Sequence, residues 1–219
     1  MDFKGDGVVV IGLGRFGTAV AQSLIRLGHD VLGIDESADL VQSWADQLTH
    51  VVEADSTNAD TLKRLGVHDY PHAVVAIGTD LEASVLTVLA LSELGVPDIW
   101  AKALNRNHGR ILEKTGAHHV VFPEAAMGER VAHLVTGKMM DFIEFDDGFA
   151  IAKTNAPAEA FGRTLGQSGL RTKHGVTVVG VKRPHQDFTY ATQDTLVERG
   201  DLLIVSGATP LVEKFAALK

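Results

Sequence analysis

The chain has 219 residues, a formal net charge of −8 at pH 7 and no cysteine. Its apolar fraction of 45% and charged fraction of 22% are those of an ordinary globular protein, long enough for one large domain or two modest ones. The negative charge, with no basic stripe to offset it, argues against nucleic acid as a partner. The absence of cysteine excludes disulfides, thiolate metal sites and cysteine nucleophiles, and it fits a cytoplasmic protein.

Neither the N-terminus nor any apolar stretch has the pattern of a membrane segment. Residues 1–6 carry two acids and lack the basic region that opens a signal peptide. The longest apolar helical stretch, residues 83–94, is interrupted by polar side chains and is shorter than the ~20 residues that span a bilayer. We therefore expect no signal peptide and no direct insertion into a membrane.

An apolar strand predicted at 8–11 runs into a glycine-rich turn, G-x-G-x-x-G, and then into a predicted amphipathic helix at 18–27. Gly12 permits the tight bend, Gly14 lets a pyrophosphate approach bare backbone, and Gly17 lets the helix pack closely on the strand. The free N–H groups at the start of the helix favour a phosphate. The turn therefore predicts a dinucleotide site formed by Gly12, Leu13, Gly14, Arg15, Phe16 and Gly17.

A second apolar strand, predicted at 31–34, ends in Asp35, which lies 18 residues beyond Gly17. This is about where a ribose-binding carboxylate belongs in such a motif, roughly 20 residues on. A carboxylate in this place also repels a 2′-phosphate. We therefore expect an unphosphorylated ribose and disfavour NADP.

Strand and helix patterns alternate through the first half of the chain. Further strands are predicted at 50–54, 73–77, 99–103 and 120–122, and further helices at 38–47, 59–65, 81–94 and 106–115. Short apolar strands that alternate with helices indicate a parallel sheet covered on both faces. The predicted fold class is α/β, a Rossmann-type doubly wound parallel sheet.

In such a sheet the ligand lies along the carboxyl ends of the strands. Ser56, with Asp55, is expected beside the adenine or its ribose, although Ser56 is also suited to cap a helix. Lys102 and Asn105 are expected to offer charge and hydrogen bonds to phosphate. The residues predicted to converge there from the later strands are Asp55, Ser56, Ile77, Gly78, Lys102 and Asn105.

The pattern changes after Pro123. An apolar stripe from Met127 to Phe142 predicts a helix that packs on either domain or on another subunit. Short strands then dominate, which predicts a small α+β domain with a single helix after its first strand. The expected organisation is an N-terminal domain at 1–123, a crossover helix at 124–141 and a C-terminal domain at 142–219, with strands at 149–154, 177–182, 188–190 and 202–205.

Several short motifs follow one another over nearly the whole chain. They include Ile-Gly-Leu-Gly-Arg-Phe-Gly at 11–17, Ala-Asp-Ser-Thr at 54–57, Ala-Ile-Gly-Thr-Asp at 76–80, Ala-Lys-Ala at 101–103, Leu-Glu-Lys-Thr-Gly-Ala at 112–117, Pro-Glu at 123–124 and Glu-Arg-Gly-Asp-Leu-Leu-Ile-Val at 198–205. In order and spacing they resemble the KtrA and TrkA regulators of potassium transport, which are built from RCK (KTN) domains.

The resemblance implies an N-terminal domain that binds ATP, ADP or NAD(H) and a C-terminal RCK domain. It implies homodimers that assemble into an octameric ring on a membrane potassium transporter subunit of the KtrB or TrkH type. The protein would then be cytoplasmic and peripheral to the inner face of the membrane. Nucleotide exchange would change the shape of the ring and gate transport.

The resemblance also implies roles for individual residues. Arg15 would reach the terminal phosphate of ATP, and Glu124 would help to hold Mg or another cation beside the phosphates. An acid such as Glu124 also stabilises a helix start without any ligand. A second ligand, cyclic di-AMP, would bind the C-terminal domain through Arg171, His174 and Val176; alternatively Val176 belongs to a dimer-interface core and the cations are solvated.

The runner-up function is an NAD-dependent dehydrogenase, because the same fold serves hydride transfer. Its scattered candidates for a catalytic acid or base are His174, His185, Asp187 and Lys182. They match no dehydrogenase motif, and the chain lacks G-x-S-x-G and a Walker motif. We therefore favour a regulator that is not an enzyme and binds no metal through histidine.

Overall fold

The computed structural model describes residues 7–135, 139–145 and 147–218. The chain divides into two compact units, Met1–Ala125 and Ala126–Lys219. Within the described residues, no helix combines the length and the apolar character that a membrane crossing needs.

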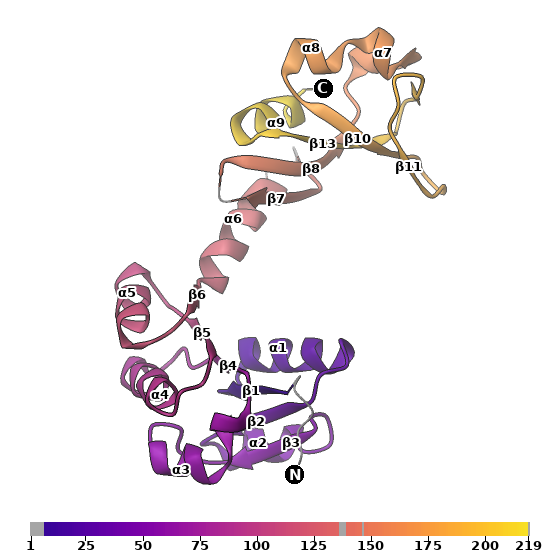
Figure 1. Cartoon of the computed structure of the whole chain (residues 1–219). Coiled ribbons are helices and arrows are strands. Elements are labelled where there is room, and N and C mark those ends of the chain that lie inside the picture. Colours follow the sequence, from indigo (N-terminus) through magenta and orange to yellow (C-terminus); the bar gives the residue numbers. More distant parts are fainter. Residues whose placement is uncertain (1–6, 136–138, 146, 219) are drawn as a thin grey trace. The chain divides into compact units, whose positions relative to one another are not determined.

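The first unit is built on a six-stranded parallel sheet in the order β3-β2-β1-β4-β5-β6 (Figure 1). This order places β1 and β4 side by side, at the point where the chain switches from one half of the sheet to the other. It is the strand order of the Rossmann fold, and it confirms the predicted fold class. The strands are β1 Val8–Ile11, β2 Val31–Asp35, β3 His50–Glu53, β4 His72–Val75, β5 Asp98–Lys102 and β6 His119–Val121.

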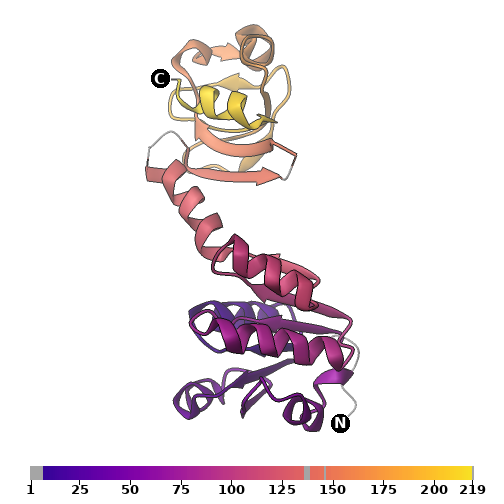
Figure 2. The ribbon, with the colours of Figure 1, turned by 90° about the vertical axis from the view of Figure 1, so that its left-hand side faces the viewer.

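Helices cover both faces of this sheet because successive strand residues point to opposite sides. Val9 and Ile11 pack in one core with the helices α3, α4 and α5. Val8 and Val10 pack in a second core with α1 and α2. Figure 2 looks onto the side that α4 and α5 cover. The helices are α1 Arg15–Arg26, α2 Ala38–Trp44, α3 Ala59–Arg64, α4 Leu81–Glu93 and α5 Arg106–Thr115.

Side-chain caps fix where the later helices begin. The caps of α2, α3, α4 and α5 each accept a hydrogen bond from a backbone N–H in the first turn, and they are Ser37, Asn58, Asp80 and Asn105. Helix α1 differs, because its cap is Gly14 and makes no side-chain hydrogen bond. The first N–H groups of α1 are therefore not satisfied by a side-chain cap of this kind.

The second unit contains a five-stranded sheet in the order β11-β10-β13-β8-β7, with antiparallel pairs throughout. Its core lies between this sheet and the helices α8 and α9, where Leu170 and Phe215 pack on sheet residues such as Leu203. A small two-stranded sheet pairs β9 with β12. The strands are β7 Asp141–Phe145, β8 Phe149–Asn155, β9 Arg163–Thr164, β10 Thr177–Lys182, β11 Phe188–Tyr190, β12 Leu196–Val197 and β13 Leu202–Ala208.

Two expectations about the second half were wrong. The crossover helix α6 covers Pro123–Val135 and so ends before the predicted residue 141, and Phe142, the last residue of the predicted helical stripe, lies on strand β7. Residues 136–138 of that predicted helix lie outside the described residues. After β8 the chain forms two short helices, α7 Leu165–Ser168 and α8 Leu170–His174, because Gly169 in a left-handed conformation separates them.

The C-terminal helix α9, Thr209–Ala216, was not predicted either. Pro210 at its start is a signal that sequence reasoning missed, because proline is favoured in the first turn of a helix.

Candidate functional site

The glycine turn between β1 and α1 has the geometry that its spacing predicts. Gly12 has a φ of +93°, and a Cβ there would lie 3.1 Å from the backbone of Ala76 and Ile77. A Cβ on Gly17 would lie 1.8 Å from the carbonyl oxygen of Gly12. Both positions therefore require glycine, one for its backbone conformation and the other for the contact between helix and turn.

Gly14 is different, because no steric reason requires glycine there. Its φ of −70° suits any residue, and a Cβ would meet nothing within 4 Å. This open space adjoins the start of α1, where backbone N–H groups and the helix dipole favour an anion. The neighbouring Leu13 is buried, Phe16 is half-buried, and Arg15 is exposed. The turn therefore offers an open place for a phosphate beside a cationic side chain.

Asp35 ends β2 and is bonded to the glycine turn. Its Oδ2 accepts a hydrogen bond of 2.6 Å from the backbone N–H of Leu13, and its Oδ1 accepts one of 2.9 Å from the N–H of Ser37. Each carboxylate oxygen keeps further acceptor capacity. The carboxylate is thus held in place while it remains able to accept hydrogen bonds from ribose hydroxyls.

Lys102, the last residue of β5, brings a buried cation to the same edge of the sheet. Its Nζ lies 5.7 Å from the centre of the Phe16 ring. A Cβ on Gly78 would stand 2.9 Å from this Nζ, so the absence of a side chain at Gly78 leaves room for the ammonium. The half-buried Ile77 lies against Gly12 of the turn. The predicted convergence of strand ends therefore holds for Ile77, Gly78 and Lys102.

Glu124, in the first turn of α6, lies against this cation. Its Oε1 is 2.6 Å from the Nζ of Lys102. The hydrogen bond from Lys102 holds the pKa of Glu124 below its ordinary value, and the positive charge of Arg15 contributes in the same direction. Arg15 and Lys102, which are far apart in the sequence, thus share one acidic neighbour.

Three residues predicted to contact the nucleotide form hydrogen bonds within the chain instead. The hydroxyl of Ser56 is buried and lies 2.9 Å from that of Thr87 on α4, so it neither caps a helix nor faces an open site. Asp55 is exposed, and hydrogen bonds from the Thr57 side chain and backbone lower its pKa. Asn105 is also exposed, and it caps α5 by accepting from the N–H of His108. Asp55 and Asn105 remain accessible, whereas Ser56 does not.

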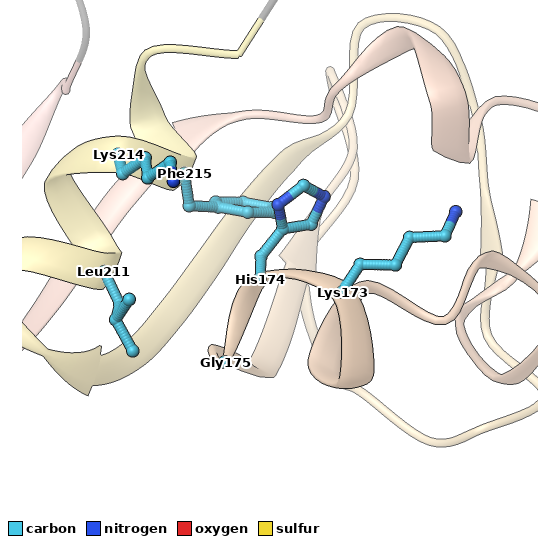
Figure 3. A pocket seen from close by; sticks show the side chains of 6 residues that line it. All are labelled: Lys173, His174, Gly175, Leu211, Lys214 and Phe215. Atoms are coloured by element: carbon cyan, nitrogen blue, oxygen red, sulfur yellow. The ribbon is translucent and has the colours of Figure 1, made fainter.

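In the second unit, a pocket of about 240 Å³ opens between α8 and α9 (Figure 3). His174 faces the ring of Phe215, with 5.4 Å between the ring centres. Three of the residues that line the pocket are basic. The full lining is Lys173, His174, Gly175, Leu211, Lys214 and Phe215. Of the residues predicted for a second ligand, only His174 lines this pocket.

Val176, also predicted to contact the second ligand, is 0% exposed in the single chain and belongs to the core of the second unit. Sequence reasoning also missed Glu159, which pairs with Lys173 at 3.1 Å and with His174 at 2.5 Å. A separation of 14 or 15 residues in the sequence leaves no periodic signal for these pairs. Glu159 therefore already supplies an anion to this basic region.

Comparison with known protein families agrees with both units. The TrkA-N domain family matches residues 8–123, which include the glycine turn and all six strands of the parallel sheet. The TrkA-C domain family matches residues 150–219. The chain belongs to the TrkA family of potassium uptake proteins. The TrkA-N match contains every candidate residue of the first site except Glu124, which follows it directly.

Two relatives resemble this TrkA-family chain over most of its length. Ktr system potassium uptake protein C of Bacillus subtilis is 36% identical, covering 94% of each chain. Ktr system potassium uptake protein A of the same organism is 33% identical, covering 97% of this chain and 96% of the relative. Among solved structures, the GsuK channel bound to NAD has a TM-score of 0.68 at 19% identity; the match covers all of this chain and 40% of the channel chain.

Proposed function

We propose that this chain is a nucleotide-binding regulatory subunit that gates a membrane potassium transporter. The observation that carries the proposal is the open space at Gly14, beside the start of α1 and the anchored carboxylate of Asp35. Glycines at Gly12 and Gly17 are explained by the fold alone, whereas Gly14 is explained by a ligand that approaches the backbone. The potassium role is supported by the family and by the relatives of similar length.

The proposed ligand is an adenine nucleotide with an unmodified ribose, namely ATP and ADP or NAD(H). The carboxylate of Asp35 suits ribose hydroxyls and repels a 2′-phosphate. Arg15 and Lys102 add two cations at the phosphate end, which favours a ligand with several negative charges. NAD, present in the GsuK structure, itself contains the ADP group that ATP and ADP share.

A cation such as Mg²⁺ is proposed to bind only together with the nucleotide. The described residues contain no group of three His, Cys, Asp or Glu side chains that suits a metal ion. Magnesium usually takes one or two carboxylates and completes its shell with phosphate oxygens and water. Glu124 would supply the carboxylate, and the nucleotide would supply the rest.

The assembly is proposed to use α6. Met127, Val131 and Val135 recur at intervals of four residues, and their exposed fractions are 54%, 44% and 80%. Such an apolar stripe on one face of a helix favours burial against another surface. We place it in a homodimer, which would build an octameric ring on the cytoplasmic side of a KtrB- or TrkH-like transporter subunit.

The basic pocket of the second unit remains a proposed site for cyclic di-AMP, with His174 and the nearby Arg171 facing the phosphates. The dehydrogenase alternative has less support. Of its candidates, His174 is paired with Glu159 and Lys182 donates to the backbone carbonyl of Gln186. Such pairings do not decide the matter, because a catalytic histidine is often oriented by a carboxylate; the regulator is favoured because the relatives of similar length are potassium uptake proteins.

Exchange of subunits in a potassium uptake assay tests the proposed function. The chain would replace Ktr system potassium uptake protein A in Bacillus subtilis cells that depend on that system, and uptake of potassium would be measured at limiting concentration. We expect the wild-type chain to support uptake and Asp35→Ala to lose nucleotide control of it. Uptake that is unaffected by Asp35→Ala would contradict nucleotide gating.

A further inference from the structure

Glu124 and its two cationic neighbours form a charge cluster at the mouth of the glycine turn. Glu124 accepts a hydrogen bond from Lys102, and its pKa also responds to the charge of Arg15. Among the described residues it is the one acid that forms an ion pair with Lys102. The cluster thus joins the ammonium of Lys102 to one carboxylate from α6, and the charge of Arg15 acts on the same carboxylate.

The burial of Lys102 makes an anionic partner necessary. Only 11% of its side chain is exposed, whereas 66% of the Glu124 side chain is exposed. A buried ammonium without an anion is strongly unfavourable, and an aromatic face such as that of Phe16 compensates for only part of the lost hydration. Glu124 is the partner that can leave more easily, because most of its side chain already contacts solvent and its carboxylate would be hydrated at once.

The position of the ammonium matches the position expected for phosphate. Lys102 lies beside Gly78 at the end of β4 and beside Phe16 in the first turn of α1. These are the carboxyl ends of strands and the start of the helix where a Rossmann fold binds the phosphates of its ligand. The Glu124 carboxylate therefore occupies the cationic end of the same site.

We propose that Glu124 is a built-in anion that pairs with Lys102 in the empty site, and that the free end of the nucleotide's phosphate chain takes its place on Lys102, which leaves the Glu124 carboxylate available to a cation beside the phosphates. The inference rests on the proposed nucleotide function and adds a regulation to it. Because Glu124 belongs to the first turn of α6, its release changes the contacts that hold the beginning of that helix. Binding of the nucleotide thereby alters the start of α6, the helix that carries the exposed apolar stripe.

The consequence is a gain in affinity when Glu124 loses its charge. Isothermal titration calorimetry with ATP, ADP and adenosine, in EDTA to exclude divalent cations, compares the wild-type chain with Glu124→Gln. We expect ATP to bind about fivefold more tightly to the variant, because loss of a competing ion pair worth ~1 kcal/mol changes affinity by this factor. The gain is smaller for ADP and absent for adenosine.

Glu129→Gln is the matched control. Glu129 is an exposed acid on the same helix, so its substitution changes the net charge by the same amount without touching the site. We expect it to change ATP affinity less than twofold. If the wild-type chain binds ATP and Glu124→Gln binds it no more tightly, the displacement is wrong while the proposed function stands. Equal gains for ATP and adenosine, or for both variants, also overturn the displacement, and a wild-type chain that binds no nucleotide overturns both proposals.

Discussion

Gly14→Ala separates the ligand role of the glycine turn from its structural role. The added methyl group enters space that is empty to 4 Å, and the φ of −70° is allowed for alanine. Alanine is a poorer helix cap than glycine, by ~0.5–1 kcal/mol. Loss of a glycine also reduces the entropy of the unfolded chain, which stabilises the folded chain by ~0.4–1 kcal/mol. The two effects nearly cancel, so we expect a free energy of unfolding within ~0.5 kcal/mol of wild type.

The same methyl group would stand where the phosphate approaches the backbone. Loss of a charge-assisted hydrogen bond to phosphate costs ~1.5–3 kcal/mol, which weakens binding by a factor of about 10 to 150. Calorimetric titration with ATP measures this loss, and urea denaturation measures the stability. We therefore expect a variant that is folded normally and binds ATP at least about tenfold more weakly.

Two further alanine variants serve as controls. Gly128→Ala, in α6, also adds a methyl group to open space at an ordinary φ and should leave ATP affinity unchanged. Gly17→Ala should destabilise the first unit strongly, because its Cβ would overlap the carbonyl of Gly12. Unchanged ATP affinity in Gly14→Ala would refute the argument that this position is glycine because a phosphate binds there.

Two other predictions concern charge. Arg15→Ala should weaken ATP by ~1.5–3 kcal/mol and ADP much less, if Arg15 meets the terminal phosphate; equal losses in calorimetry would make Arg15 an ordinary surface residue. Burial lowers the pKa of His108 from its ordinary 6.5, so the unfolded chain takes up a proton before the folded one and stability falls as the pH drops below about 6.5. His108→Asn keeps an acceptor for the N–H of Leu104, which bonds to the ring in the wild type. It should make the loss between pH 6.5 and 5 shallower, by up to ~1.4 kcal/mol per pH unit. Thermal unfolding across this range checks it, and an unchanged slope would contradict it.

The first unit was predictable because its signals are local. Each strand is a short apolar run, and each turn after it contains glycine or a helix cap within a few residues, as at Gly12 and Ser37. The order of strands then follows from the handedness of parallel connections. Strand boundaries shifted by one or two residues, as for β4, because pairing with β1 and β5 decides where the ladder ends.

The second unit was less predictable because its order depends on long-range pairing. Met139 and Phe142 continue the spacing of the α6 stripe, yet both are buried in the core around the antiparallel sheet. Periodicity cannot distinguish these two outcomes, since an apolar residue every three or four positions also satisfies a helix followed by a strand.

The candidate site likewise combines residues that local signals predict with contacts that depend on long-range packing. Asp35 was placed correctly at its strand end because the motif has a fixed spacing. The pairing of Ser56 with Thr87 was not visible in the sequence, because it joins residues 31 positions apart through the packing of α4. The contact between Glu124 and Lys102 likewise depends on where α6 starts relative to β5.

Native mass spectrometry of the purified chain tests the central claim most directly. We expect that the chain carries an adenine nucleotide from the cell, that added ATP and ADP exchange with this nucleotide, and that the Asp35→Ala variant carries none. A wild-type chain that retains no nucleotide and binds none of ATP, ADP or NADH when they are added would contradict the claim.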